Sequence, residues 1–219
     1  MDKPIIQYAL DVTTIDRALA LAHQAVDAGV DWLEVGGPLI KFEGIHAIEA
    51  IHHAFPDQYI IVDFMILSGS ERYIEAAKSN GANNVTITAL APDETVQEAI
   101  SLCKEYKIDS TIDLFNKDNL VFHAKKYESM GANYIMVHYG VDQKKFNPDG
   151  SPISNLKKVV EQVNIPVSYA TYDYVESREA VDAGASVIVQ GEPLLSTSNP
   201  KEKLEQFIQK TLASGKEIE

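Results

Sequence analysis

Four segments of this sequence share one pattern: a glycine, a pair of mostly small or polar residues, and then an apolar run that favours a strand. They begin at Gly29, Gly81, Gly131 and Gly184. Each glycine follows a stretch with helical periodicity, so we expect each to end a helix in the left-handed conformation. The glycines lie 50 to 53 residues apart. That spacing is too long for one strand and one helix, and it suits two such pairs.

A second set of strands is therefore expected midway between these repeats. The strand-like segments found there are Ile5–Asp11, Ile60–Met65, Asp109–Phe115 and Pro166–Tyr172. Amphipathic segments that favour helices lie between the strands, at Ile15–Ala28, Ile45–Phe55, Glu94–Tyr106, Leu120–Met130 and Leu156–Val163. The strands are rich in Val and Ile and hardly alternate, as is typical of strands covered on both faces. We infer eight strands, each followed by a helix.

Alternating strands and helices predict a parallel sheet with right-handed crossovers. Eight such pairs in 219 residues predict a single α/β domain, a (β/α)8 TIM barrel over residues 1–219. The alternative, an open doubly wound sheet, would need a glycine-rich phosphate loop after its first strand. The chain has Asp11-Val-Thr-Thr at that place. Only Asp142–Ser154 is expected to form a longer loop, and we expect Lys216–Glu219 to be frayed.

Charge and cysteine content limit the partners of the chain. The net charge is −13, which disfavours binding to nucleic acid and to anionic membrane surfaces. No run of about 18 apolar residues is present, so no transmembrane helix is expected. The single cysteine, Cys103, rules out a disulfide within the chain. Together with an N-terminus unlike a signal peptide, this composition predicts a cytoplasmic protein.

The carboxyl ends of the strands are where such a barrel carries its chemistry. Four acids and one histidine fall there: Asp11, Glu34, Asp63, Asp113 and His138. A buried carboxylate is costly unless it is paired, hydrogen-bonded or bound to a metal. Four acids converging on one rim therefore favour a functional site. Their oxygen-rich chemistry suits Mg²⁺, and zinc is disfavoured because His138 is the only histidine at a strand end.

Several motifs, in the order in which they occur, resemble those of one family. They are Leu-Glu34-Val-Gly-Gly-Pro-Leu-Ile-Lys41-Phe-Glu43-Gly, Ile-Val-Asp63, Asp113-Leu-Phe-Asn116 and Val-His138-Tyr-Gly-Val-Asp142-Gln. From Gln7 to about Pro200, the chain resembles 3-hexulose-6-phosphate synthase and its sister, 3-keto-L-gulonate-6-phosphate decarboxylase. Both belong to the orotidine 5′-phosphate decarboxylase superfamily.

The resemblance implies a homodimeric barrel of the ribulose-phosphate-binding type, in which Mg²⁺ stabilises an enediolate intermediate. It implies Glu34 and Asp63 as metal ligands. Asp11, Asp63 and His138 would be the catalytic residues, with Asp11 holding substrate hydroxyls and His138 handling a proton. The candidate substrate-binding residues are Lys41, Asp113, Thr171, Gln190 and Gly191.

The third strand departs from the family pattern Asp-x-Lys-x-x-Asp. Here Met65 stands in the place of the lysine and Ser68 in the place of the second aspartate, so that only Asp63 is kept. A thioether cannot stabilise an enediolate or deliver a proton as an ammonium does. The family reaction is therefore expected to be slower by orders of magnitude if that lysine is essential. The apolar run from Met65 to Leu67 is expected to lie at a dimer interface.

The expected phosphate site also departs from the family pattern. After the eighth strand the family has Gly-Arg, whereas this chain has Gly191-Glu192 followed by Pro193, which lacks an amide donor. After the seventh strand, Asp173 follows Thr171 and Tyr172 where the family has a Gly-Gly pair. A dianionic phosphate would meet two carboxylates instead of a cation and backbone amides, which disfavours a phosphorylated substrate.

These observations predict a carbon–carbon lyase, an aldehyde-lyase or carboxy-lyase of the hexulose-phosphate synthase type. It would be assisted by Mg²⁺ and act through an enediolate on a ketose or keto-acid sugar, and the sequence leaves open whether that sugar carries a phosphate. Two alternatives stay open. One is an inactive or rerouted homologue that serves as a binding or regulatory barrel. The other is a metal-assisted epimerase with His138 as its base.

Overall fold

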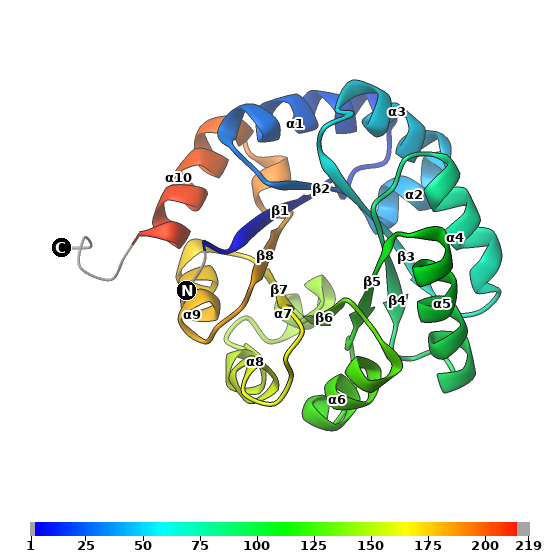
Figure 1. Cartoon of the computed structure of the whole chain (residues 1–219). Helices are drawn as coiled ribbons and strands as arrows, with labels where there is room; N and C mark the ends of the chain where they lie inside the picture. The colour runs from blue at the N-terminus through cyan, green and yellow to red at the C-terminus, as the bar shows by residue number, and fades with distance from the viewer. Residues whose placement is uncertain (1–2, 214–219) are drawn as a thin grey trace.

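Eight parallel strands form a closed barrel, in which β1 pairs with both β2 and β8 (Figure 1). The computed structural model describes residues 3–213. The strands are β1 (Ile5–Ala9), β2 (Trp32–Val35), β3 (Tyr59–Ile66), β4 (Asn84–Thr88), β5 (Asp109–Asp113), β6 (Tyr134–Val137), β7 (Val167–Thr171) and β8 (Val187–Gln190). The predicted TIM barrel is thereby confirmed, and the open sheet is excluded because its edge strands would be unpaired.

Helices surround the barrel and follow the strands along the chain (Figure 1). They are α1 (Ile15–Ala28), α2 (Gly37–Glu43), α3 (His46–Ala54), α4 (Ser70–Ser79), α5 (Asp93–Tyr106), α6 (Leu120–Met130), α7 (Val141–Phe146), α8 (Ile153–Val160), α9 (Tyr174–Asp182), the 3-10 helix η1 (Leu194–Ser196) and α10 (Pro200–Leu212). No helix among residues 3–213 is long and apolar enough to cross a membrane.

The four repeat glycines all adopt the expected left-handed conformation. Gly29, Gly81, Gly131 and Gly184 have φ angles between 93° and 97°. Gly29, for example, follows α1 directly, and its N–H bonds to carbonyls of the last turn of that helix. A residue with a Cβ is strained at such angles, so glycine is favoured where the chain leaves a helix and enters the next strand.

Several element boundaries differ from the prediction by a few residues, and three of the differences lie near the carboxyl-terminal rim. The first strand ends at Ala9, so Asp11 lies in the loop that follows it. The third strand runs on to Ile66 with a register shift between Val62 and Ile66, and Met65 has a φ of 47°. The predicted loop Asp142–Ser154 is wrong in part, because α7 occupies its first half. The Gln143 side chain accepts a hydrogen bond from the Gly140 N–H and stabilises the start of that helix.

Two apolar clusters hold the barrel together. The larger one lies between the strands and the helices, and the smaller one fills the lumen around Ala9, Trp32, Met136, Val187 and Val189. In the lumen Trp32 stacks on Tyr59, with ring centroids 4.2 Å apart, and Tyr134 meets Trp32 edge-on. These three aromatic residues each begin a strand, so they close the amino-terminal end of the lumen. The opposite end is left for the polar residues.

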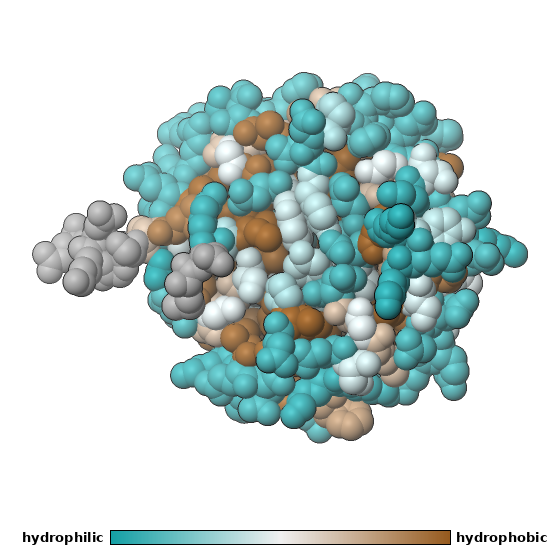
Figure 2. Space-filling view, viewed as in Figure 1, coloured by the Kyte–Doolittle hydropathy of each residue, from teal (hydrophilic) through white to brown (hydrophobic). Residues whose placement is uncertain are grey.

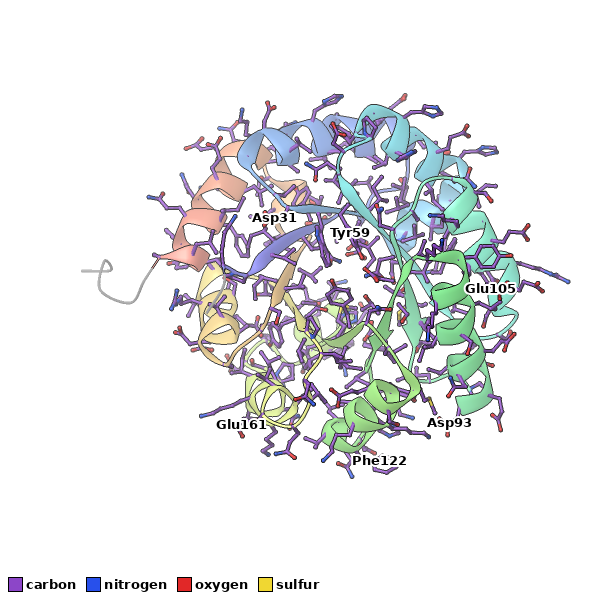
Figure 3. All side chains as sticks on the ribbon, viewed as in Figure 1. Asp31, Tyr59, Asp93, Glu105, Phe122 and Glu161 are labelled. Carbon is purple, nitrogen blue, oxygen red and sulfur yellow. The ribbon has the colours of Figure 1, made fainter. Side chains whose placement is uncertain are left out.

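The surface is largely hydrophilic, as the net charge predicts. Figure 2 shows hydrophilic residues over most of the visible face, with apolar residues mainly in the recesses between them. In Figure 3 the labelled Tyr59 lies within the ring of strands, whereas Glu105, Phe122 and Glu161 lie on the outer helices. The ring is therefore a packed interior, and a ligand must bind at its rim.

Candidate active site

Three carboxylates meet at the carboxyl-terminal rim of the barrel. Asp11 follows β1, Glu34 lies in β2 and Asp63 lies in β3, and these strands are neighbours. We call these three residues the acid cluster. The charge of Asp63 raises the pKa of both Asp11 and Glu34, and the charge of Asp11 also raises that of Glu34, so the structure brings the predicted acids together. The converging strand ends place them there.

Burial raises the pKa of each member of the acid cluster. The pKa of Asp11 rises to about 6, because burial is reinforced by the charges of Asp63 and Glu192. Burial and the charges of Asp63 and Asp11 hold the pKa of Glu34 well above its ordinary value. Burial likewise raises the pKa of Asp63, against the Thr86 hydroxyl bond and the positive charges of His138 and Lys41.

Two polar side chains in the lumen orient the cluster from below. Gln7 Nε2 donates a hydrogen bond of 2.7 Å to Glu34 Oε2, and Thr86 Oγ1 donates one of 2.7 Å to Asp63 Oδ1. The Thr86 hydroxyl also accepts the Met65 N–H at 2.9 Å. Fixed donors of this kind hold a carboxylate in one orientation. The prediction missed both residues, although a glutamine in the apolar strand Ile5–Ala9 was a usable signal.

Three glycines make room for the carboxylates. A Cβ added to Gly36 would clash with Asp11 Oδ1, and one added to Gly37 would lie 2.6 Å from Asp63 Oδ2. A Cβ on Gly191 would lie 3.2 Å from Asp11 Oδ2. The Asp11 carboxylate is thus enclosed between Gly36 and Gly191. The structure places the predicted residue Gly191 at the site, where the lack of a side chain leaves room for the Asp11 carboxylate.

His138 and Asp113 form a pair beside the acid cluster. His138 Nδ1 lies 2.8 Å from Asp113 Oδ2, and Asp113 Oδ1 accepts the Phe115 N–H at 2.8 Å. Burial disfavours the charged imidazole, but the charges of Asp113, Asp63 and Asp11 outweigh it and raise the pKa of His138. Asp113 is fully buried and both its oxygens are engaged. It therefore orients His138, which differs from the predicted contact with substrate.

Thr171 and Gln190 do not join the acid cluster. Their strand neighbours Ala170 and Val189 belong to the lumen cluster, so by alternation Thr171 and Gln190 face the helices. Thr171 Oγ1 donates to the Asp173 carbonyl, and Gln190 Nε2 donates to the Gly191 and Glu192 carbonyls. Both side chains therefore support the loops after β7 and β8. This placement departs from the predicted contact with substrate.

Those two loops present carboxylates near the rim. Asp173 Oδ1 accepts the N–H groups of Val175 and Glu176, at 2.8 and 2.9 Å, and so caps α9. Glu192 Oε1 accepts the Ser196 hydroxyl at 2.7 Å. The charge of Glu192 also contributes to the raised pKa of Asp11, after burial and Asp63. The predicted anionic character of this corner is present in the structure.

The residues that replace the family lysine and second aspartate differ in their placement. Met65 is half-buried in β3, and Ser68 is exposed in the connection to α4. Ile66 is buried, whereas Leu67 has 56% of its surface exposed. The strand that supplies Asp63 therefore contributes no cation to the rim from these positions.

The acid cluster has the chemistry of a magnesium site rather than a zinc site. Among residues 3–213, no group of three or more His, Cys, Asp or Glu side chains is arranged to hold a metal ion. Mg²⁺ needs only one or two carboxylates, because water and substrate oxygens complete its shell. Buried carboxylates that raise one another's pKa would be relieved by a divalent cation. Glu34 and Asp63 are therefore the residues that could hold such an ion, and their role as metal ligands stays a prediction.

Comparisons with known proteins agree with this architecture. Residues 4–207 match the family described as orotidine 5′-phosphate decarboxylase / HUMPS. The 3-hexulose-6-phosphate synthases of Methylomonas aminofaciens and Mycobacterium gastri are 30% and 29% identical to the chain, and the matches cover 90% and 89% of it and 93% of each relative. The solved structure of 3-hexulose-6-phosphate synthase from Salmonella typhimurium superposes with a TM-score of 0.88 at 26% identity, covering 95% of this chain and 98% of that one. The chain therefore belongs to the orotidine 5′-phosphate decarboxylase / HUMPS family, and relatives that it matches over most of its length are lyases that act on a carbon–carbon bond.

Proposed function

We propose that this barrel is a carbon–carbon lyase or aldolase that acts through an enediolate on a ketose or keto-acid sugar. The observation that carries the proposal is the His138–Asp113 pair beside a cluster of three carboxylates, of which Glu34 is buried and Asp11 and Asp63 are partly buried. An ionisable pair next to acids of raised pKa is typical of a site that moves protons. The related 3-hexulose-6-phosphate synthases support the reaction class.

The reaction can be written with every atom accounted for. In the direction of bond formation, a base takes a proton from the hydroxyl-bearing carbon beside the ketone, which leaves an enediolate. That carbon attacks an aldehyde carbon, and the aldehyde oxygen takes up a proton. The reverse direction breaks the bond and releases the aldehyde. A keto acid that loses CO₂ reaches the same enediolate, which is then protonated on carbon.

His138 is the residue suited to the proton transfers. Its Nδ1 is held by Asp113, so Nε2 is the nitrogen left for the substrate. The carboxylate of Asp113 fixes the ring orientation and stabilises the imidazolium that forms when His138 takes a proton. Asp11 has both oxygens at the rim between Gly36 and Gly191, where they can accept hydrogen bonds from substrate hydroxyls.

We assign Mg²⁺ as the cofactor, with Glu34 and Asp63 as its ligands. When bound, the ion supplies positive charge where the enediolate develops negative charge. Gln7 and Thr86 each engage one oxygen of these two carboxylates, and within residues 3–213 no hydrogen bond engages the other oxygen of either one. The proposal is consistent with the raised pKa of both Glu34 and Asp63, for which burial is the main cause.

We further propose that the substrate carries no phosphate. In many barrels the loops after strands seven and eight bind phosphate through their backbone amides. Here the amides of Val175 and Glu176 already bind the Asp173 carboxylate. Glu192 adds a second negative charge close to Asp11. A phosphate dianion would have to displace one carboxylate and approach another.

The decisive test is a set of ligand titrations by calorimetry, with ribulose and ribulose 5-phosphate, each with and without Mg²⁺. We expect ribulose to bind when Mg²⁺ is present, and Glu34→Gln and Asp63→Asn to lose Mg²⁺ binding. The exposed Asp57→Asn is the matched control. Tight binding of the phosphate ester would overturn the assignment of an unphosphorylated substrate. Unchanged Mg²⁺ affinity in both acid variants would overturn the metal site.

Proton exchange separates the lyase from the two alternatives. In D₂O, the wild-type protein with ribulose and formaldehyde should form a new carbon–carbon bond and exchange deuterium into the ketose. Exchange without any bond formation would favour the epimerase. If neither deuterium exchange nor bond formation occurs while ligand binding is retained, the result would favour a binding barrel. The lack of a cation after Asp63 supports that alternative.

We also propose a homodimer. Several large apolar side chains are exposed on α2 and on the connections that follow β3 and β4: Phe42, Leu67 and Leu90, with 73%, 56% and 46% of their surfaces exposed. A second copy could bury these side chains, because contiguous exposed apolar surface marks association sites. Light scattering that gives the mass of a monomer would contradict this.

A further inference from the structure

Lys41 reaches the acid cluster through a gap left by a glycine. It lies four residues after Gly37, so the two residues share one face of α2. Lys41 Nζ lies 3.2 Å from the point that a Cβ on Gly37 would occupy, and Asp63 Oδ2 lies 2.6 Å from the same point. The Lys41 ammonium and the Asp63 carboxylate therefore both border the gap that the missing side chain of Gly37 leaves. A side chain on Gly37 would separate them.

The acid cluster needs a cation that the strands do not supply. The residues after Asp63 in β3 are Phe64, Met65 and Ile66. His138 is already bonded to Asp113. Lys41 Nζ and Asp63 Oδ2 both lie within 3.2 Å of one point beside Gly37. Lys41 is thus the positive side chain that α2 adds to this rim.

Lys41 is an exposed residue, and its ammonium lies at the gap beside Gly37. Attraction between an exposed ammonium and a carboxylate is weaker than between two charges away from water. A substrate oxygen that enters this gap would displace water and strengthen the attraction.

We propose that Lys41 is a catalytic cation, which contacts the anionic oxygen of the substrate beside Asp63, and that Gly37 is the positioning residue that admits it. This inference rests on the proposed function, because the oxygen in question belongs to the enediolate. No residue of β7 or β8 takes part in it. It gives the segment 36–41 a chemical task within this chain: two glycines leave room for the carboxylates, and the lysine adds a positive charge beside them.

The first test measures turnover of ribulose with formaldehyde. We expect Lys41→Met to lower kcat by about 10²–10³-fold, with a much smaller change in KM, because the charge acts on the developing oxyanion. Lys41→Arg keeps the positive charge and should lose much less of kcat. Gly37→Ala should lower kcat more than Lys41→Met does, because its Cβ would meet both Lys41 Nζ and Asp63 Oδ2. Lys104→Met, at an exposed position on α5, is the control that should leave kcat unchanged.

The second test does not depend on turnover. Oxalate is a planar dianion that mimics an enediolate, and its binding can be measured by calorimetry with Mg²⁺ present. We expect the Lys41→Met variant to bind oxalate about tenfold more weakly than the wild type, with an unchanged melting temperature. Weaker oxalate binding by Lys41→Met, in a protein that shows no turnover, would support the role of Lys41 and refute the proposed lyase activity. Equal oxalate affinity in the two proteins, or an equal loss of kcat in Lys41→Arg and Lys41→Met, would overturn the inference.

Discussion

Replacing Asp11 by asparagine should stabilise the protein above pH 6 while it weakens the site. Asn has nearly the shape of Asp and cannot ionise. Among residues 3–213, no protein group donates a hydrogen bond to the Asp11 carboxylate, so the substitution breaks no bond of that kind. What it removes is a negative charge enclosed near Asp63 and Glu192.

The size of the effect follows from the pKa of Asp11. Burial, with the charges of Asp63 and Glu192, raises this pKa from 3.8 to about 6. The folded state therefore holds the proton more tightly than the unfolded state does, and stability is lost as the pH rises from about 4 through about 6. Each pKa unit corresponds to about 1.4 kcal/mol, so the ionised carboxylate costs about 3 kcal/mol at pH 8.

Urea denaturation without divalent cations measures this cost directly. At pH 8 the free energy of unfolding of Asp11→Asn should exceed that of the wild type by up to about 3 kcal/mol, and at pH 5 by about half of that. For a chain of this size the gain at pH 8 corresponds to roughly 6–12 °C in Tm. The exposed Asp57→Asn should change stability by less than about 0.5 kcal/mol at either pH.

Two results would refute the reasoning. An Asp11→Asn protein that is less stable than the wild type at pH 8 would show that the carboxylate is favourably bonded in the folded state. A gain that does not change between pH 8 and pH 5 would show that ionisation is not its source.

Three further predictions concern the surroundings of the acid cluster. Asp113→Asn removes the strongest of the negative charges that together outweigh burial and raise the pKa of His138. This pKa should therefore fall in an NMR titration, the acidic limb of the kcat profile should move to lower pH, and kcat should drop by about 10²-fold; an unmoved His138 titration would contradict this. Thr86→Val leaves Asp63 Oδ1 without its donor and should cost about 1–3 kcal/mol in urea denaturation, and a cost below about 0.5 kcal/mol would exclude Thr86 as a support. Glu192→Arg should strengthen ribulose 5-phosphate binding by at least about tenfold in calorimetry while it leaves ribulose binding little changed; no gain in affinity would show that Glu192 does not oppose phosphate.

The sequence was sufficient to predict the barrel because its signals are local. A glycine that ends a helix and an apolar run that follows it are visible in a few consecutive residues, and they recur at Gly29, Gly81, Gly131 and Gly184. The order of strands then follows from the rules of parallel sheets. The short helix after β6 was missed, because the Gly140–Gln143 bond that starts it is one weak interaction within a polar segment.

The candidate site was predicted only as a set of residues. Strand ends showed that Asp11, Glu34, Asp63 and His138 would share one rim, since neighbouring strands bring their ends together. Which atoms meet depends on rotamers and on backbone spacing across the barrel, and these are not encoded in any short segment. The hydrogen bond between Asp113 and His138 could not be predicted for this reason, and neither could the closeness of Gly37 to Asp63.

The aromatic layer that closes the lumen also gives the protein an internal optical reporter. Trp32 is the one tryptophan of the sequence, it is 9% exposed, and it stacks on Tyr59 inside the barrel. Near 295 nm, excitation selects this one indole, so the emission spectrum describes the lumen alone. Loosening of the strands should shift that spectrum to the red even while the outer helices keep their circular dichroism signal. Opening of the barrel and melting of its helical shell can thus be followed separately in the unlabelled protein.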